Sequence, residues 1–427
     1  MKKSSFFKLN IRLKIILVVL LLLVLTGAFL LANKFHIFAD VTPQAGGLCK
    51  YLISMDRNGY VSPTDLSNKL SSIEAQSKMP YNGLVFRIPA AESLMAAGNT
   101  IDLPTVEGQL APLRNMANKP SKLKHNFVRV LLKFPGDFFD ADVEWTRIAN
   151  NFAVLSQGLA NLRSAGFGVD GIAFDNEGPY SGAACAGGMW NYPSSGDVVQ
   201  SCITHPEKTL VDYQNRSRVR GKQVLDKILS SSTFQDIKIL TYLDSYYSCS
   251  SSTEPYFSHN FEMLGSFTLG MLESTKDKTA KIIDGGEYSY NAAGDQSAFI
   301  RRYNYRKSGM PNTATGCPFI RNAESGASQY PDFHTYWEQT ISVAHGLYND
   351  VQNPGDTPVY AHPQTSDNIR DAVHYSLENS DEYVWFYTED VNTLDHTATN
   401  YITDRWNDPI WDARTIDIPN DLSCDLA

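Results

Sequence analysis

The chain has 427 residues, of which 43% are hydrophobic and 19% are charged. This composition can build a large core and argues against intrinsic disorder, and the length suits one large domain with long loops or two ordinary domains. The formal net charge is −9, and it is unevenly distributed, because five basic residues precede residue 15 and all acidic residues follow residue 32. An acidic body repels phosphate backbones, so we expect no nucleic-acid partner.

A hydrophobic segment near the N-terminus predicts a membrane anchor. Residues 15–32 form an apolar run of 18 residues broken only by Thr26 and Gly27, which is close to the length of a membrane-spanning helix. The basic residues precede this run, so the positive-inside rule keeps residues 1–14 in the cytoplasm and exports the rest. A cleaved signal peptide is the alternative, although the run is long for one and lacks a small-x-small site. We expect a single-pass, membrane-anchored protein with a periplasmic or extracellular body.

The cysteines fit an exported chain. There are six, namely Cys49, Cys185, Cys202, Cys249, Cys317 and Cys424. None forms a Cys-x-x-Cys pair, so a zinc site is not expected. An even number of cysteines in an exported protein favours disulfide bonds, and Cys185 and Cys202 are the pair we expect to be joined. Free buried thiols are the alternative.

Short apolar runs alternate with helical patterns after residue 48. Eight runs predict strands: Lys50–Ser54, Gly83–Ile88, Phe127–Phe134, Gly171–Asp175, Lys238–Leu243, Lys281–Asp284, Pro358–Ala361 and Tyr383–Tyr387. Six segments predict helices: residues 65–76, 142–165, 211–229, 295–306, 336–348 and 366–377. Buried strands that alternate with helices are typical of a parallel sheet.

Eight such repeats favour a closed α/β barrel of the (β/α)8, or TIM-barrel, type. A doubly wound open sheet is the alternative, but no Gly-x-Gly-x-x-Gly follows the first predicted strand. We therefore expect a linker over residues 33–48, one barrel over residues 49–391 and a tail over residues 392–427 packed on it. The stretches 90–125 and 178–206 are predicted to be loop insertions.

In this fold the active site lies at the C-terminal ends of the strands. The densest group of polar residues follows the fourth predicted strand, where Asp175 and Glu177 share one face because strand side chains alternate. When two carboxyl groups lie this close, ionisation of both is unfavourable, so one of them tends to keep its proton. The protonated group can then donate this proton to a glycosidic oxygen. Capping of the next loop or cation binding is the alternative role.

The run Asp170-Gly-x-x-x-Asp175-x-Glu177 resembles the fourth-strand signature of the family-18 chitinase-like barrels, with Ala173 in place of the middle Asp. The resemblance implies that Glu177 is the general acid and that Asp175 orients the acetamido group of the substrate. Asn176-Glu177 is also similar to the Asn-Glu pair of the large clan of retaining glycosidases. That similarity implies that Glu177 is the acid/base and that Asn176 holds the sugar 2-hydroxyl.

A broader similarity to bacterial glycosidase-like barrels rests on the runs Phe174–Tyr180, Asp284–Tyr290 and Tyr383–Glu389. Hydrolysis by two carboxylates needs a second acid, for which Glu287 and Glu389 are the candidates. Glu287 follows two glycines that permit a tight turn, and Glu389 ends the last predicted strand. The candidate substrate-binding residues are Asn176, Tyr180, Arg87, Tyr242, Asp244, Tyr290, His362 and Trp385.

These features predict a glycoside hydrolase-like protein that cleaves, or formerly cleaved, extracellular or cell-surface polysaccharide by carboxylate acid/base catalysis, without a cofactor or a metal. The sequence has no Gly-x-Ser-x-Gly elbow, no His-Glu-x-x-His pair and no phosphate-binding loop. Two alternatives stay open. The first is a non-catalytic, membrane-tethered glycan-binding barrel, which Ala173 favours. The second is a cation-dependent enzyme in which Asp175, Glu177, Glu287 and Glu389 bind Mg²⁺ or Ca²⁺.

Overall fold

The computed structural model describes residues 49–56, 62–132, 134, 136–175, 188–190, 204–241, 263–292, 294–309, 333–349, 365–389, 391–395, 398, 401–402 and 404–415. The predicted cytoplasmic segment, membrane anchor and linker lie outside these residues, as do Cys185, Cys202 and the predicted strand Pro358–Ala361. Among the described residues, no helix is both long enough and apolar enough to cross a bilayer.

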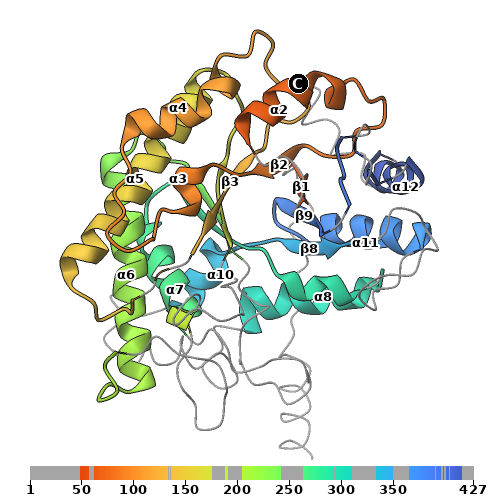
Figure 1. The fold of residues 1–427 in the computed structure, drawn as a ribbon. Coiled ribbons are helices and arrows are strands. Elements are labelled where there is room, and N and C mark those ends of the chain that lie inside the picture. Colours follow the sequence, from red (N-terminus) through yellow and green to blue (C-terminus); the bar gives the residue numbers. More distant parts are fainter. Residues whose placement is uncertain are drawn as a thin grey trace, which may run out of the picture. The chain divides into compact units, whose positions relative to one another are not determined.

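The described strands form one sheet in which all neighbours are parallel (Figure 1). The strands are β1 Tyr51–Asp56, β2 Gly83–Phe86, β3 Phe127–Leu131, β4 Gly171–Asp175, β5 Lys238–Thr241, β6 Lys281–Asp284, β7 Ser342–Val343, β8 His345–Tyr348 and β9 Tyr383–Thr388. Their order in the sheet is β7-β6-β5-β4-β3-β2-β1-β9-β8.

The two edge strands, β7 and β8, are halves of one strand separated only by Ala344. β7 pairs with β6 and β8 pairs with β9, so this strand closes the sheet into a barrel with eight strand positions. When the strand registers are extended around the barrel from Tyr348, they return to the level of Thr340, eight residues earlier in the chain and just before β7. Eight strands with a shear of eight define the TIM barrel, which confirms the predicted fold.

The helices follow the strands in the expected alternation. They are α2 Pro63–Glu74, α3 Pro89–Glu92, α4 Leu103–Arg114, α5 Asp142–Ser164, α6 Leu210–Ser231, α7 Leu264–Ser274, α8 Gln296–Asn304, α10 Phe333–Thr340, α11 Ser366–Glu378 and α12 Asp404–Thr415. Five of the six predicted helices are confirmed to within a few residues, and they correspond to α2, α5, α6, α8 and α11.

The predicted helix 336–348 is wrong in its second half. α10 ends at Thr340, and the chain continues into β7 and β8. Every residue from Ile341 to Tyr348 is buried, so the segment has no polar face, which is the pattern of a barrel strand covered on both sides. This segment fills the seventh strand position, which the sequence patterns assign to residues 358–361.

The sequence patterns also miss α4 and α7. α4 lies in the stretch predicted to be an insertion. Its N-cap is Asp102, whose carboxylate accepts a hydrogen bond from the backbone N–H of Thr105 at 2.8 Å. α7 has no exposed face, because each of its residues is buried, so it lacks the periodicity that marks an amphipathic helix. It packs against α6 at Gly221 and Gly270, where an added Cβ would lie 1.8 Å from a backbone oxygen.

The inward-facing side chains form layers contributed by alternate strands. One layer consists of Ile53, Phe127, Leu240 and Ala344, and the layer above it consists of Val85, Ala173, Gly285 and Trp385. These residues are buried. Trp385 fits into its layer because Ala173 and Gly285 are small. The lower part of the barrel is therefore a packed apolar core.

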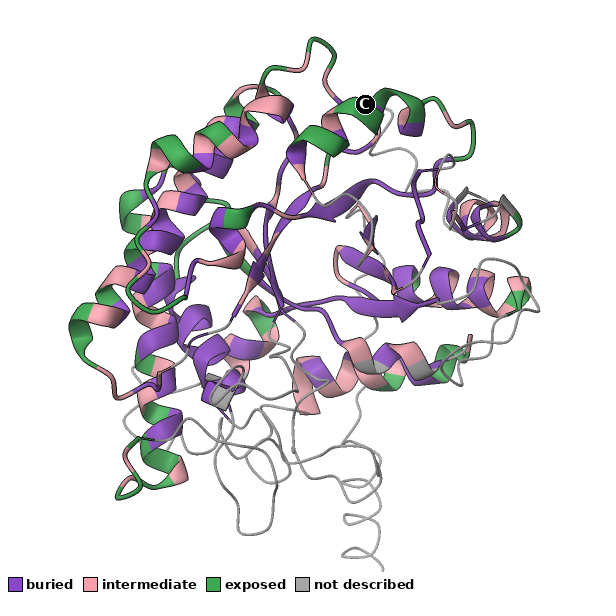
Figure 2. Ribbon diagram, in the orientation of Figure 1, coloured by how far each residue is buried: buried purple, intermediate pink, exposed green. Residues whose placement is uncertain are grey.

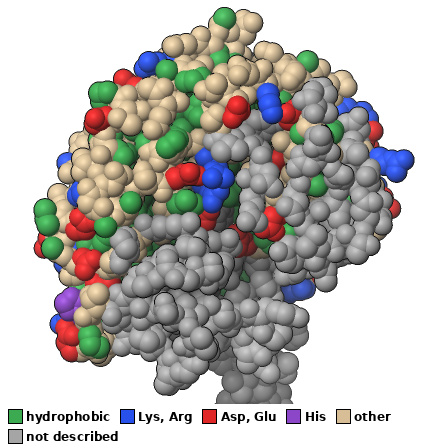
Figure 3. All heavy atoms as spheres, in the orientation of Figure 1, with side chains coloured by type: hydrophobic (Ala, Val, Ile, Leu, Met, Phe, Trp, Pro, Cys, Tyr) green, Lys and Arg blue, Asp and Glu red, His purple; other side chains and the backbone are tan. Residues whose placement is uncertain are grey.

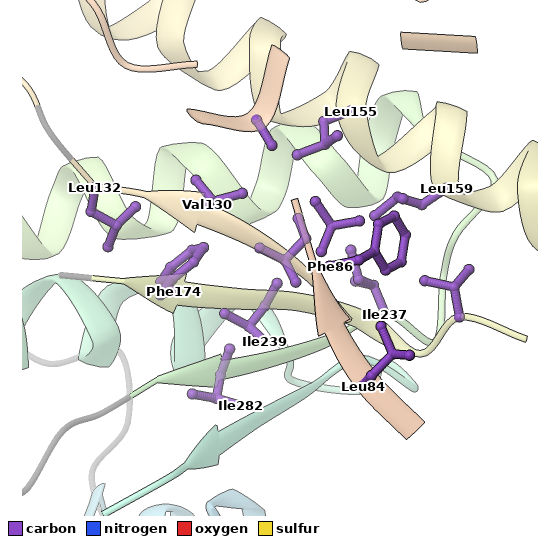
Figure 4. Close-up of a cluster of buried hydrophobic side chains, with 14 of the residues drawn as sticks. Leu84, Phe86, Val130, Leu132, Leu155, Leu159, Phe174, Ile237, Ile239 and Ile282 are labelled. Carbon is purple, nitrogen blue, oxygen red and sulfur yellow. The ribbon is translucent and has the colours of Figure 1, made fainter. Parts of the chain in front are cut away.

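The outward-facing side chains of the same strands pack against the helices. Figure 4 shows Phe86 of β2, Val130 of β3 and Phe174 of β4 beside Leu155 and Leu159 of α5. Most residues of the strands are buried, whereas helices such as α2, α5 and α6 expose one side (Figure 2). Strands that are covered on both faces give the residues at their ends a rigid support.

Candidate active site at the carboxyl ends of the strands

Charged side chains replace the apolar filling of the barrel above the layer that contains Trp385. Asp175 is the last residue of β4, and it faces inward because Ala173 does. The guanidinium of Arg129, on β3, forms an ion pair with the carboxylate of Asp175. The two side chains are only 20% and 12% exposed, so the barrel shields this pair from most of the solvent.

Arg129 is a site residue that the sequence reasoning misses. Its signal is a single charged residue inside the otherwise apolar strand Phe127–Leu131. A charge in a strand that is covered on both faces needs a partner, because an unpaired buried charge is strongly unfavourable. Asp175 is that partner. Asp175 thus has a cationic partner that the sequence patterns do not indicate, whereas its predicted pairing with Glu177 lies outside the described residues.

Arg87 follows β2 and points a second cation toward the same end of the barrel. Its Nε lies 2.5 Å from Oε1 of Glu92, which belongs to the short helix α3. The two side chains are partly exposed, at 27% and 29%. Arg87 therefore lies at the strand end where the sequence predicts it, and it is paired with an acid from the short helix that follows its own strand.

The turn after β6 carries two of the predicted residues, Glu287 and Tyr290. It is a 3-10 helix over Glu287–Ala292, and Glu287, its first residue, is half-buried. Gly286, just before it, has a φ of 50°, which is the left-handed region that favours glycine. The tight turn expected from the two glycines is therefore present.

An aromatic cluster occupies the side of the mouth formed by β6, β8 and β9. The ring centroid of Tyr290 lies 5.3 Å from that of Tyr348, 5.6 Å from that of Trp385 and 6.4 Å from that of Tyr387. The rings of Tyr290 and Tyr387 are inclined by only 11°. Trp385 is buried beneath this cluster, and its indole N–H donates to the carbonyl of Gly285 at 2.7 Å.

Glu389 directly follows β9 beside the same cluster. The hydroxyl of Tyr348 lies 3.4 Å from Oε2 of Glu389. The structure thus brings three predicted site residues together, namely Tyr290, Trp385 and Glu389. Tyr348 belongs to the segment that the sequence patterns assign to a helix, which is why it is not among the predicted site residues.

The described acids approach the mouth from different sides of the barrel. β4 and β9 are opposite each other, because three strand positions separate them in either direction. Asp175 and Glu389 therefore come from opposing strands, and Glu287 follows β6, midway between them. Such an arrangement places carboxylates on more than one side of a bound molecule, as hydrolysis by two carboxylates requires.

Asp170, the first residue of the chitinase-like run, lies at the opposite end of the barrel. It precedes β4, accepts from the hydroxyl of Tyr383 at 2.6 Å and lies 2.8 Å from Nδ1 of His125. Burial raises the pKa of Asp170, but the hydrogen bonds from His125 and Tyr383 and the nearby Lys238 outweigh burial and hold it below its ordinary value. Residues at this end of a TIM barrel serve stability.

The remaining candidates lie outside the described residues. They are Glu177, Asn176, Tyr180, Tyr242, Asp244 and His362. Within the described part of the chain, no group of three or more His, Cys, Asp or Glu side chains is arranged to hold a metal ion. Of the acids that the cation-dependent alternative requires, Glu177 is not described, so that alternative stays a prediction.

The comparisons with known proteins concern the fold. No protein family matches the chain, and no curated protein matches it in sequence. Its backbone is similar to the endo-beta-mannanase/endo-beta-glucanase of Prevotella bryantii, at a TM-score of 0.42 and 10% identity over 85% of this chain and 48% of that one. The chain thus spans about half the length of that protein.

Two further solved structures extend this comparison. A glycoside hydrolase family 5 enzyme from Prevotella bryantii gives a TM-score of 0.41 at 10% identity, over 85% of this chain and 96% of that one. A beta-glucosidase from Thermotoga maritima gives 0.35 at 10% identity, over 89% and 88%. All three are glycan-cleaving enzymes by name, and at these TM-scores and identities they assign no activity to this chain.

Proposed function

We propose that this protein is a glycoside hydrolase that cleaves extracytoplasmic polysaccharide at the carboxyl end of its barrel. The observation that carries the proposal is the change inside the barrel from apolar layers to Asp175, with Glu287 and Glu389 at the ends of two other strands. An apolar floor beneath several acids is the environment in which carboxyl groups work as acids, bases or nucleophiles.

The roles follow from the contacts of each acid. Asp175 is paired with Arg129, which balances its charge and suits it to bind a substrate hydroxyl or amide as a carboxylate. Glu177, two residues further along the sequence, is the proposed general acid. Glu287 and Glu389 are the candidates for the second carboxylate, either as a nucleophile or as the base that activates water.

The aromatic cluster supports a sugar as the substrate. Tyr290, Tyr348 and Tyr387 combine flat apolar faces with polar hydroxyls, which matches the faces and edges of a pyranose ring. On the part of the face in Figure 3 that is not grey, acidic and basic side chains are interspersed. A surface of mixed sign offers no electrostatic advantage to a polyanion such as nucleic acid.

The test is hydrolysis of a panel of amino-sugar and neutral polysaccharides by the full chain and by three variants, Glu177→Gln, Glu287→Gln and Glu389→Gln. Loss of the general acid is expected to lower kcat by about 10²–10⁴-fold. Glu107→Gln, on the outer helix α4, is the matched control and retains activity. Unchanged turnover by all three site variants, or cleavage of no glycan by the parent, rejects the proposal.

A specific observation favours the second candidate, a glycan-binding barrel without catalysis. Ala173 stands at the position of the middle Asp in the family-18 signature, and it is fully buried in the layer that Trp385 fills. A carboxylate has no room there, so a substrate-assisted mechanism lacks one of its acids. Binding of a glycan without release of any cleavage product identifies this candidate.

We also propose that the apolar run of residues 15–32 anchors the barrel to the membrane with its mouth outside the cytoplasm. The support is the sequence: the length of the run and the basic residues before it. Membrane fractions of expressing cells are expected to retain the protein through a high-salt and carbonate wash. Recovery in the soluble fraction with an intact N-terminus contradicts this proposal.

A further inference from the structure

The backbone leaves the barrel ladder at Gly286, just before the turn that carries Glu287. In a regular parallel ladder the N–H of Gly286 would donate to the carbonyl of Ala344, because Gly286 O already accepts from the N–H of Gly346 at 3.2 Å. The N–H of Gly286 instead donates to Oδ1 of Asp284 at 3.2 Å. The carbonyl of Ala344 therefore needs another donor.

Arg306 supplies this donor from outside the barrel. It lies in the helical turn Tyr305–Gly309 after α8, and it is fully buried. Its Nη1 donates to the carbonyl of Ala344, and its Nη2 donates to Oγ of Ser289 at 3.1 Å. A Cβ on Gly286 would lie 2.2 Å from Cζ of Arg306, so the guanidinium packs directly against the turn.

His345 completes the cluster as a neutral acceptor. Burial lowers the pKa of His345 well below its ordinary value, and nearby Arg306 lowers it further. Its Nε2 lies 2.9 Å from the carbonyl of Asn379 and must donate to it, so Nδ1 is the acceptor. Nδ1 lies 2.7 Å from Oγ of Ser289 and 3.2 Å from Nη2 of Arg306. The hydroxyl of Ser289 thus accepts from Arg306 and donates to His345.

Ser289 belongs to the same turn as Glu287 and Tyr290. The cluster of Arg306, Ser289 and His345 holds this turn at two points. One is the side chain of Ser289, and the other is the strand at Ala344, which pairs with Gly286 through Gly346. The indole of Trp337 holds the arginine in turn, since its Nε1 donates to the backbone oxygen of Arg306 at 2.8 Å. Buried networks in which each member has partners are rigid, and they specify one arrangement.

We propose that Arg306 is a positioning residue, which acts through Ser289 and Ala344 to fix the turn that carries Glu287 and Tyr290 at the barrel mouth. Arg306 is fully buried, and its guanidinium donates to Ala344 and Ser289. The expected effect of Arg306 on turnover rests on the proposed function, whereas the effect of Arg306 on the conformation of the turn does not.

The experiment compares Ser289→Ala with Ser156→Ala in the full chain. Both serines are buried and hydrogen-bonded, but Ser156 donates to a backbone oxygen within α5. In Ser289→Ala, the amides of residues 286–292 are expected to exchange with deuterium about tenfold faster, the factor that corresponds to roughly 1.4 kcal/mol. A kcat lowered about tenfold with a KM changed less than about twofold is expected as well, because a misplaced acid weakens the transition state more than binding.

The two readouts separate the possible outcomes. Unchanged exchange in residues 286–292 of Ser289→Ala overturns the proposal. Faster exchange with an unchanged kcat on a hydrolysed glycan supports the hold on the turn but overturns its consequence for turnover, and it leaves Glu389 as the second carboxylate. If the parent protein hydrolyses no glycan, the proposed function is rejected. The comparison of deuterium exchange then decides alone whether the cluster fixes the turn. Ser156→Ala is expected to match the parent in both measurements.

Discussion

The indole N–H of Trp385 donates a hydrogen bond of 2.7 Å to the carbonyl oxygen of Gly285, across the interior of the barrel. The same ring lies against β8, since a Cβ on Gly346 would be 2.5 Å from Cζ2 of Trp385. One large side chain thus fills a layer whose neighbouring positions are small, and it forms the floor of the candidate site.

Gly346→Ala is expected to destabilise the protein by about 1–3 kcal/mol, because the added methyl group overpacks the indole in a core that cannot expand. Gly108→Ala is the control, since Gly108 lies in α4 with no atom within 4 Å of an added Cβ. The control is expected to be neutral or to stabilise by up to about 1 kcal/mol. Urea unfolding measures both, and an unchanged midpoint for Gly346→Ala would contradict this packing.

Most of the barrel strands can be predicted from the sequence, because they are buried on both faces and are bounded by glycines or charged residues. Gly171–Asp175 and Lys281–Asp284 agree with the predicted strands at both ends. The strand Ser342–Tyr348 cannot be predicted in this way, because only Ile341 separates it from α10 and it is as apolar as a buried helix. Because α7 is buried on all sides, its sequence has no polar face and therefore lacks the helical period of apolar residues that predicts a helix.

The candidate site was predictable residue by residue but not as an arrangement. Alternation along a strand places Asp175 and Trp385 on inner faces, and the strand ends place Glu389 at the mouth. The depth of each side chain depends on the strand registers, which pair residues far apart in the sequence. For this reason the burial of Trp385 and the pairing of Arg129 with Asp175 required the structure.

Removing one partner of the Arg129–Asp175 ion pair is expected to cost about 2–4 kcal/mol of stability, because the other charge stays within the barrel. The double variant Arg129→Gln/Asp175→Asn is expected to be more stable than the sum of the two single changes predicts. Arg163→Gln/Asp236→Asn tests an exposed pair and should show a coupling below about 1 kcal/mol. Denaturant unfolding of all variants gives the two coupling energies, and equal values would show that the barrel does not shield the inner pair.

The depressed pKa of Asp170 predicts a specific loss of stability in acid. A carboxyl group whose pKa is lower in the folded protein stabilises it above the pKa of the unfolded chain, about 3.9, and loses this effect as the pH falls through the folded value. Asp170→Asn is therefore expected to be less stable than the parent at pH 7 and to lose less stability between about pH 4 and pH 2. Unfolding free energies across this range test the sign, with Asp236→Asn as the exposed control. Parallel curves for parent and Asp170→Asn would refute the linkage.

The aromatic cluster at the mouth predicts an effect on substrate binding. Tyr387→Leu removes a ring that lies nearly parallel to that of Tyr290 while it keeps an apolar side chain. If the rings contact sugar, KM for a hydrolysed glycan, or Kd for a bound one, rises by about 2–10-fold, the equivalent of roughly 0.5–1.5 kcal/mol. Tyr375→Leu, on the outer helix α11, should leave both constants unchanged. A Tyr387→Leu protein that loses stability but keeps its glycan affinity would show that the cluster extends the packed core toward the mouth. Removing a ring that only packs lowers stability, whereas removing a ring that contacts sugar also weakens glycan binding.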